Sequence, residues 1–167
     1  DTSLHLPDYR SAERTFQLLT QVSGRAGRHE KQGEVIVQTY TPEHYAIELS
    51  KDQLYEPFYE QEMHNRRLAG YPPYYYLALV QVTHEDVMVA AEYSGKVATY
   101  LRENLSFNVS IIGPTTASIT RLQNRYRYQC LIKYRIEPNL IPVLLDLIKI
   151  YRSEWIKKGI TLSIDLD

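Results

Sequence analysis

The stretch that decides the fold is Arg125-Tyr126-Arg127-Tyr128-Gln129-Cys130-Leu131-Ile132-Lys133-Tyr134-Arg135-Ile136. Successive residues of a β-strand point to opposite faces of the sheet. Alternate positions here divide into an apolar and aromatic side, which begins at Tyr126, and a mainly basic side, which begins at Arg125. The pattern predicts one long strand whose apolar side is covered by helices and whose basic side faces away from them.

The segments on either side of this strand complete a small α+β domain. Before it we expect a strand, a helix and a short strand, at Tyr74–Thr83, Glu85–Leu105 and Asn108–Ile112. After it, Glu137-Pro138 opens a helix that Gly159 ends, and Thr161–Leu166 is the last strand. The order β-α-β-β-α-β predicts a ferredoxin-like fold, in which two helices cover one face of a four-stranded antiparallel sheet.

The first 50 residues show a different pattern. Apolar residues at helical spacing predict a helix over 11–22, and the β-branched run Glu34–Tyr40 is typical of a buried strand. Thr41-Pro42-Glu43 has the residues of a helix start. A helix, a strand and a helix in this order form the closing edge of an α/β domain.

A polar helix is expected to join the two parts. Its packed side is predicted to carry five apolar residues, Leu54, Phe58, Tyr59, Met63 and Leu68, with Glu62 among the solvated positions. Gly70-Tyr71-Pro72-Pro73 ends it, because the residue before a proline is disfavoured in helical geometry. We therefore divide the chain into 1–50, a linking helix at 51–72, and a C-terminal domain at 73–167.

Composition excludes several classes of protein. The 167 residues carry 44% hydrophobic and 23% charged residues with a net charge of −1, so a folded domain is expected and any affinity for nucleic acid must be local. Cys130 is the single cysteine and the five histidines are scattered, so we expect no metal site. No run has membrane-spanning length, no signal peptide is visible, and the chain lacks a starting Met. We expect a cytoplasmic, nucleoid-associated piece of a longer protein.

The stretch Gln21-Val22-Ser23-Gly24-Arg25-Ala26-Gly27-Arg28 has the residue types of a phosphate site. Arg25 and Arg28 can each offer a rigid fork of donors, and Gly24 and Gly27 allow close approach of a nucleotide. If the helix continues, Gln21, Arg25 and Arg28 share one face. They would stabilise charge on a transferring phosphoryl group. The alternative is two solvated arginines in a glycine-rich loop.

A second candidate site is the basic side of the long strand. Between residues 121 and 135 there are five basic residues and no acid. Such a strip can hold phosphates, with exposed tyrosines available for stacking. An ordinary solvated strand whose arginines protect an edge is the alternative. The candidate DNA- or partner-binding residues are Arg121, Arg125, Arg127, Gln129, Lys133 and Arg135.

These residues together resemble one family. Gln21–Arg28 is similar to the last conserved motif of superfamily 2 helicases, which supplies the arginine finger, with Ser23 where Ala is more usual. The whole chain resembles the replication-restart helicases of that superfamily, the PriA (primosomal protein N′) family. The matching strings are Pro7-Asp8-Tyr9-Arg10, Glu13-Arg14, Thr15–Leu19, Gln38-Thr39-Tyr40, Pro42-Glu43-His44, Tyr71-Pro72-Pro73, Gly113-Pro114, Arg125-Tyr126-Arg127 and Gln129.

The resemblance implies an ATP-dependent 3′–5′ DNA helicase that remodels stalled forks and assembles the primosome. It implies that residues 1–50 end the second helicase lobe, with Arg28, Arg25 and Gln21 as catalytic residues. The partners implied are fork and single-stranded DNA, other primosome proteins, and the acidic tail of the single-stranded-DNA-binding protein. That tail would dock on Arg125 and Gln129, because an Arg suits a terminal carboxylate.

The chain also departs from the family pattern. It has no glycine-rich Gly-Lys-Ser/Thr loop, no recognisable acidic magnesium box and no cysteine-rich zinc insertion. ATP, Mg²⁺ and zinc are therefore expected only in a longer parent protein, and the chain by itself is expected to be inactive. Two alternatives stay open: a non-catalytic module that binds nucleic acid or protein, and the tail of another superfamily 2 ATPase acting on RNA. The Pro72-Pro73 junction and the Arg125–Gln129 string argue against the second.

Overall fold

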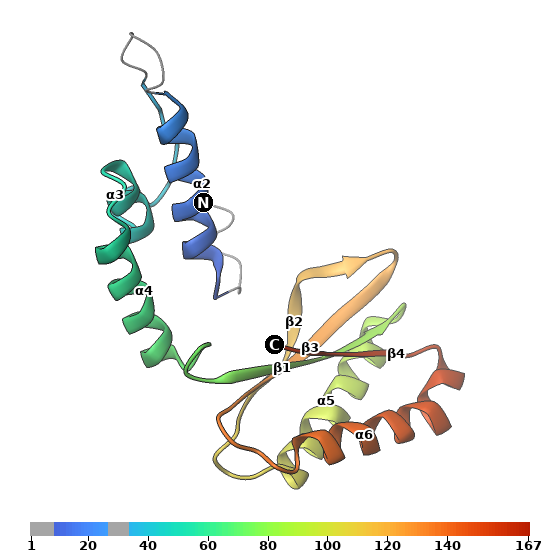
Figure 1. The fold of residues 1–167 in the computed structure, drawn as a ribbon. Coiled ribbons are helices and arrows are strands. Elements are labelled where there is room, and N and C mark those ends of the chain that lie inside the picture. Colours follow the sequence, from blue (N-terminus) through green and yellow to red (C-terminus); the bar gives the residue numbers. More distant parts are fainter. Residues whose placement is uncertain (1–8, 27–33) are drawn as a thin grey trace. The chain divides into compact units, whose positions relative to one another are not determined.

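The chain divides into two compact units, Asp1–Ala69 and Gly70–Asp167. A computed structural model describes residues 9–26 and 34–167 (Figure 1). No helix in the described part of the chain is both long and apolar enough to cross a bilayer.

The first unit is built from helices α2 (Ser11–Ala26), α3 (Tyr45–Lys51) and α4 (Tyr55–Ala69). Their small core forms around Phe16 of α2 and Phe58 of α4, whose rings stack with centroids 4.1 Å apart. Ala12 and Ala46 are buried beside them. The helix expected over 11–22 is thus present and extends to Ala26, through Gly24.

The strand expected at Glu34–Tyr40 is not formed. Residues 34–39 have no regular secondary structure, and Ile36 and Tyr40 are 86% and 92% exposed. A strand needs a neighbour to complete its hydrogen bonds, and the described residues of this unit contain no other strand. The helix that follows begins at Tyr45 rather than at Thr41-Pro42-Glu43. His44 caps it, since its Nδ1 accepts a hydrogen bond from the Ala46 N–H at 3.2 Å.

The packed side of α4 also differs from the expected one. Of the five apolar residues assigned to it, Phe58 is buried, whereas Leu54, Tyr59 and Leu68 are exposed. The buried positions are Phe58, Glu62 and Arg66, which are spaced four residues apart along one face. Glu62 was expected in solvent but is only 4% exposed, because it is paired with Arg66. A count of apolar residues could not reveal a helix that buries an ion pair.

The second unit has the expected ferredoxin-like order. Its elements are β1 (Tyr76–His84), α5 (Val87–Asn104), β2 (Ser110–Leu122), β3 (Arg125–Tyr134), α6 (Leu140–Ile150) and β4 (Thr161–Leu166). The sheet order is β2-β3-β1-β4, with all neighbours antiparallel. Both helices lie on one side of the sheet (Figure 1). The prediction of an α+β fold is confirmed.

The core of this unit lies between the sheet and its two helices. Ala78, Val80 and Val82 of β1 meet Cys130 and Ile132 of β3, as the alternation predicts. From the helices, Val97 and Leu101 of α5 and Leu144 and Leu147 of α6 close over them. The other face of the sheet carries the intervening residues of each strand.

Strand β2 is much longer than the expected Asn108–Ile112. It continues past Gly113-Pro114, where one register shift occurs, and through a second shift before Arg121. Gly113 has φ +116°, and a Cβ there would lie 2.6 Å from the Gln129 carbonyl oxygen. The residues that suggested a stop therefore accommodate a bulge within a continuing strand. Gln123 and Asn124 turn the chain into β3, both with positive φ.

The last helical stretch is held at both ends. At its start, Glu137 Oε1 accepts a hydrogen bond from the Asn139 N–H at 3.1 Å, and Glu137 Oε2 accepts one from the Ser106 N–H at 3.0 Å. At its end, α6 passes into a π-turn (Tyr151–Trp155) and a short 3₁₀ turn (Ile156–Lys158). Gly159 then stops it in the left-handed conformation, as expected.

Candidate functional site

Helix α2 presents two of the candidate phosphate-binding residues. Gln21 and Arg25 are one helical turn apart on the same side, and both are exposed. Gly24 lies between them inside the helix, and a Cβ added there would meet nothing within 4 Å. Arg28 and Gly27 lie outside the described residues. The exposed amide and guanidinium fit one side of a nucleotide phosphate.

The described residues do not by themselves supply the metal ligands for the other side of such a site. A phosphate-transfer centre also needs donors around the β- and γ-phosphates and oxygen ligands for Mg²⁺. Among residues 9–26 and 34–167, no three His, Cys, Asp or Glu side chains gather as metal ligands would. The described residues of α2 therefore offer one side of a phosphate site, and the sequence contains no glycine-rich loop that could offer the other.

On β3 the candidate residues fall into groups with different surroundings. Arg121, at the β2–β3 turn, donates to the Asn124 side chain and lies over the Tyr126 ring, 5.0 Å from its centroid. Arg127 is partly exposed, and its Nε donates to Gln81 Oε1 at 3.3 Å. Gln129 pairs across the sheet with Gln81 on one side and Thr115 on the other. Gln81, Arg127 and Gln129 lie on the side of the sheet away from the helices, whereas Arg121, which pairs with Tyr126, lies on the opposite side.

Arg125 is held by several acceptors within its own domain. Its Nε donates to Thr83 Oγ1 at 3.0 Å, and Nη2 lies 3.0 Å from the Thr83 carbonyl and 2.5 Å from that of Gly159. Nη2 also lies 3.1 Å from Thr161 Oγ1. Arg125 thus connects β3 to the end of β1 and the start of β4. Sequence reasoning did not find this role, which depends on the strand order.

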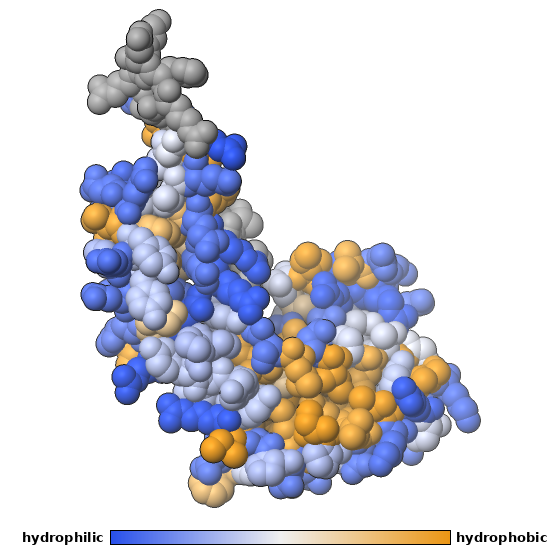
Figure 2. Space-filling view, viewed as in Figure 1, coloured by the Kyte–Doolittle hydropathy of each residue, from blue (hydrophilic) through white to orange (hydrophobic). Residues whose placement is uncertain are grey.

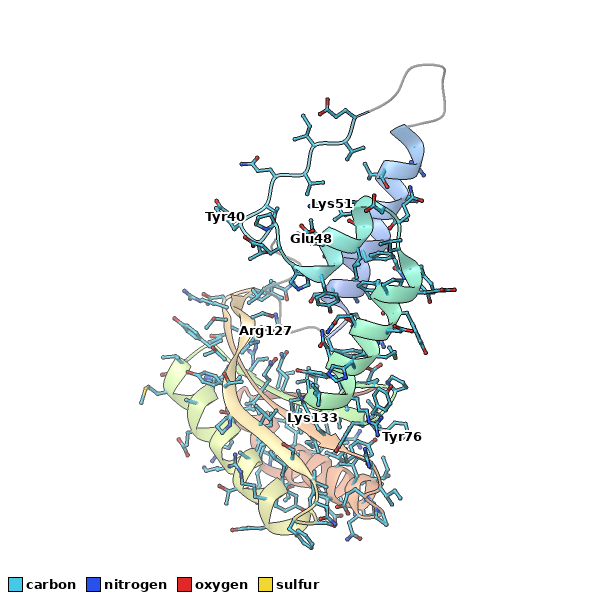
Figure 3. All side chains as sticks on the ribbon, turned by 90° about the vertical axis from the view of Figure 1, so that its left-hand side faces the viewer. Tyr40, Glu48, Lys51, Tyr76, Arg127 and Lys133 are labelled. Atoms are coloured by element: carbon cyan, nitrogen blue, oxygen red, sulfur yellow. The ribbon has the colours of Figure 1, made fainter. Side chains whose placement is uncertain are left out.

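Lys133, near the other end of β3, and Arg135, just beyond it, each lie against a tyrosine ring, but only Lys133 is buried. Lys133 is 8% exposed, and its Nζ lies 3.6 Å from the centroid of the Tyr71 ring. The Arg135 guanidinium carbon lies 4.7 Å from the centroid of Tyr75. Figure 3 shows Arg127 and Lys133 toward opposite ends of the sheet. The basic strip predicted from sequence is therefore accessible only in part. Lys133 is buried, Arg125 and Arg127 are partly exposed, and Arg135 is exposed, while the exposed Arg121 lies on the other side of the sheet.

The tyrosines of β3 do not accompany its basic residues. Tyr128 pairs with Val82 and lies on the helix-covered side, and Tyr134 packs against the core. On the other side, the residues of the two central strands are aliphatic, polar or basic. They are Leu77, Leu79, Gln81 and Thr83 of β1 and Arg125, Arg127, Gln129, Leu131 and Lys133 of β3. The described strand residues therefore give this open face no aromatic side chain on which bases could stack.

The single cysteine is a core residue. Cys130 is 1% exposed, and burial raises the pKa of its thiol to about 11, an effect that Arg102 partly opposes. A buried thiol with a raised pKa has low reactivity, as is usual for structural cysteines.

Sequence reasoning missed one polar cluster in the first unit. Arg66 makes ion pairs with Glu62 and Glu13, and Tyr45 donates a short hydrogen bond to Glu62. The four-residue spacing of Glu62 and Arg66 was a visible signal, since such pairs are neighbours on a helix. Their burial depends on the packing of α2 and was not visible.

Comparison with known proteins gives consistent results along the chain. Residues 67–167 match the family model described as "Primosomal protein N C-terminal domain". Over its full 167 residues, the chain is 54% identical to the "Replication restart protein PriA" of Bacillus subtilis (strain 168), and it covers 21% of that protein. The chain is 42% identical to the protein of the same name from Synechocystis sp., covering 20% of it, and 30% identical to that of Treponema pallidum (strain Nichols), covering 25%.

The chain thus spans between a fifth and a quarter of the length of these relatives. The matched region begins within α4 and includes the whole ferredoxin-like unit. The chain therefore belongs to the PriA family of replication restart proteins, and its residues 67–167 are that family's C-terminal domain.

Proposed function

We propose that this chain is the C-terminal region of an ATP-dependent 3′–5′ DNA helicase that restarts replication and assembles the primosome at stalled forks. The observation that carries the proposal is similarity along the entire chain, at 54% identity, to a protein named for replication restart. The residues of the first unit add support, since α2 exposes Gln21 and Arg25 as a phosphate contact requires.

In this proposal Arg25 and Arg28 act on a nucleotide that is bound mainly by the rest of the protein. ATP and Mg²⁺ supply the phosphoryl group and its counter-charge, and zinc belongs to a part of the parent protein outside this chain. The guanidinium of Arg25 stabilises negative charge that develops on the transferring phosphoryl group. Gln21 reaches the same phosphate or orients the attacking water.

A test of this role is Arg25→Ala in the intact protein. Because an arginine finger acts in the transition state, DNA-stimulated kcat is expected to fall on the order of 10³-fold. The ATP KM should change far less, as measured by steady-state hydrolysis. Lys51→Ala is a matched control, since Lys51 is an exposed cation paired with Glu48 on α3 (Figure 3). An unchanged kcat in Arg25→Ala would remove the finger assignment.

We further propose that the open face of the ferredoxin-like sheet binds DNA and the acidic tail of the single-stranded-DNA-binding protein. The partly exposed Arg127, with Gln81 and Gln129 beside it, supports this role. Such a face can also act as an interaction module without catalysis, which is the second function that we retain.

Comparison of Arg127→Ala with Lys133→Met separates accessible from covered cations on β3. Each phosphate contact contributes about 1 to the slope of log K against log salt. Arg127→Ala should lower that slope for single-stranded and fork DNA, and Lys133→Met should leave it unchanged because Tyr71 covers Lys133. Fluorescence anisotropy measures both slopes. Salt from about 50 to 200 mM is suitable, because the affinity of a protein that contacts phosphates changes strongly over this range. Equal losses in the two variants would contradict the assignment.

For the protein tail, Gln129→Ala is a better probe than Arg125→Ala. Arg125 also holds Thr83, Gly159 and Thr161, so its removal disturbs the fold as well as any docking site. Weaker binding of the tail peptide to Gln129→Ala, with an unchanged melting temperature, supports docking on this face. Unchanged affinity in both variants would exclude it.

A further inference from the structure

A cluster of charged groups connects the three helices of the first unit. Arg66 of α4 lies at its centre, with Nη2 2.8 Å from Glu13 Oε2 of α2 and Nε 2.6 Å from Glu62 Oε1 of its own helix. Tyr45 of α3 donates to the second oxygen of Glu62. The Tyr9 ring lies over the guanidinium, with its centroid 5.1 Å from Cζ.

The cluster is largely removed from water. The side chains of Arg66 and Glu62 are 10% and 6% exposed, and that of Glu13 is 40% exposed. Burial alone lowers the pKa of Arg66, but hydrogen bonds to Glu13 and Glu62 outweigh it and raise the pKa above its ordinary value. Burial and Glu62 both raise the pKa of Tyr45. Arg66 therefore carries its charge at any physiological pH.

A buried ion pair contributes little net stability compared with apolar residues of the same size, but it can fix register. The apolar contacts between α2 and α4 rest mainly on the stack of Phe16 on Phe58, which tolerates small sliding movements. Two hydrogen bonds from a planar guanidinium do not tolerate them. The ion cluster therefore adds a directional constraint on the rotation and axial position of α2 to the apolar packing of α2 against α3.

The position of α2 matters because the same helix carries the candidate phosphate contacts. Gln21 and Arg25 follow Glu13 by 8 and 12 residues, which is roughly 12 and 18 Å along a helix. A slip of one residue would rotate the exposed side chains by about 100°. A displacement of about 1 Å at a reacting group can cost 10²-fold in rate.

We propose that Arg66 is a positioning residue, which through Glu13 holds α2 in register so that Gln21 and Arg25 meet the nucleotide. This inference rests on the proposed function of α2. Arg66 and Glu13 do not touch the nucleotide in this scheme. They act through the helix.

The test uses Glu13→Gln and Arg66→Lys in the intact protein. Glu13→Gln keeps the size of the side chain, Arg66→Lys keeps its positive charge, and each removes part of the guanidinium–carboxylate geometry. We expect DNA-stimulated kcat to fall by roughly 10- to 100-fold while the ATP KM changes less than about 2-fold. Glu48→Gln is the matched control, since Glu48 is half-exposed and pairs only along α3 with Lys51, and its kcat should stay unchanged (Figure 3).

Combination with Arg25→Ala distinguishes positioning from general loss of stability. If Glu13 acts only through α2, Glu13→Gln should have a much smaller effect on kcat once Arg25 is absent, because only Gln21 then remains to be misplaced. An additional loss in the double variant, equal to that in the single variant, would overturn the proposal. An unchanged kcat in both Glu13→Gln and Arg66→Lys, together with an inactive Arg25→Ala, would also overturn the proposal. If Arg25→Ala itself retains full kcat, the proposed function of α2 fails as well.

Discussion

At the scale of single residues, Gly113 shows how one position allows β2 and β3 to pair along their length. Its φ of +116° is unfavourable for any residue with a side chain, and a Cβ would lie 2.6 Å from the Gln129 carbonyl oxygen. That oxygen belongs to β3, so the clash cannot be relieved by a change of rotamer. Arg102 also donates to the Gly113 carbonyl, which holds the bulge against α5.

Gly113→Ala is therefore expected to destabilise the ferredoxin-like unit. Backbone strain of this kind costs about 1–3 kcal/mol, and the clash with Gln129 adds to it. Thermal denaturation followed by circular dichroism should show a melting temperature lower by at least about 5 °C.

Gly95→Ala is the matched control for Gly113→Ala. Gly95 lies within α5, and a Cβ there meets nothing within 4 Å. This substitution should raise stability by roughly 0.5–1 kcal/mol, because alanine is the better helix former. Similar losses in both variants would show that the bulge geometry is not the cause.

At the scale of secondary-structure elements, sequence predicted the second unit better than the first. The alternation from Tyr126 to Tyr134 placed Cys130 and Ile132 correctly in the core, because that side of the strand faces the helices. Strand β2 was expected to end at Gly113-Pro114, since these residues usually interrupt a strand. In the structure these two residues form a bulge within a continuing strand. The bulge depends on pairing with β3, which the local sequence does not reveal.

For the candidate site residues, too, some features were predictable from sequence and others were not. That Gln21 and Arg25 share one face of α2 followed from helical spacing alone, and the structure adds that both are exposed. The contact of Arg125 with Gly159 could not be predicted in this way, and neither could the Tyr71 ring over Lys133. In both cases the partner is distant in sequence. Spacing predicts which residues share a face, and only tertiary packing decides which of them remain accessible.

The start of α6 provides a prediction about pH. Hydrogen bonds from Ser106, together with one from the Asn139 backbone, hold the pKa of Glu137 below its ordinary value, although burial opposes them. A carboxyl group with a lowered pKa in the folded state adds stability above its unfolded pKa. That contribution is lost as the pH falls through the lower, folded-state pKa.

Glu137→Gln should therefore melt at a lower temperature than the parent at pH 7, by several degrees. The difference should shrink as the pH falls below about 4.5, near the unfolded pKa of a Glu. Melting curves between pH 3 and 7 measure it. Asp146→Asn on α6 is a suitable control, because Asp146 is exposed and pairs only with Lys149. A difference that stays constant down to pH 3 would contradict this account of Glu137.

At the scale of the whole molecule, the two units differ in their surfaces. Figure 2 shows apolar residues gathered on the ferredoxin-like unit over α6 and β4. Ile141, Leu145 and Leu166 are about half exposed there. The first unit exposes Ile36 and Tyr40 in a segment without regular structure. Strand formation by Glu34–Tyr40 requires pairing that the described residues of this unit do not provide.

The 167-residue chain by itself is predicted to hydrolyse no ATP. It offers arginines for a phosphate but has no glycine-rich loop to hold the β- and γ-phosphates. Phosphate release assays with and without single-stranded DNA test this, with the intact protein as the positive control. Turnover that persists through purification and disappears in Arg25→Ala would show that the chain contains a complete site.

The internal contacts of Arg125 have a consequence for any acidic ligand. Its guanidinium joins the ends of β1, β3 and β4 through Thr83, Gly159 and Thr161. A carboxylate that drew Arg125 away would release the Gly159 turn and loosen the edge strand β4. Binding and local opening would then be thermodynamically linked, so occupancy of this corner would be reported by faster amide hydrogen exchange in β4.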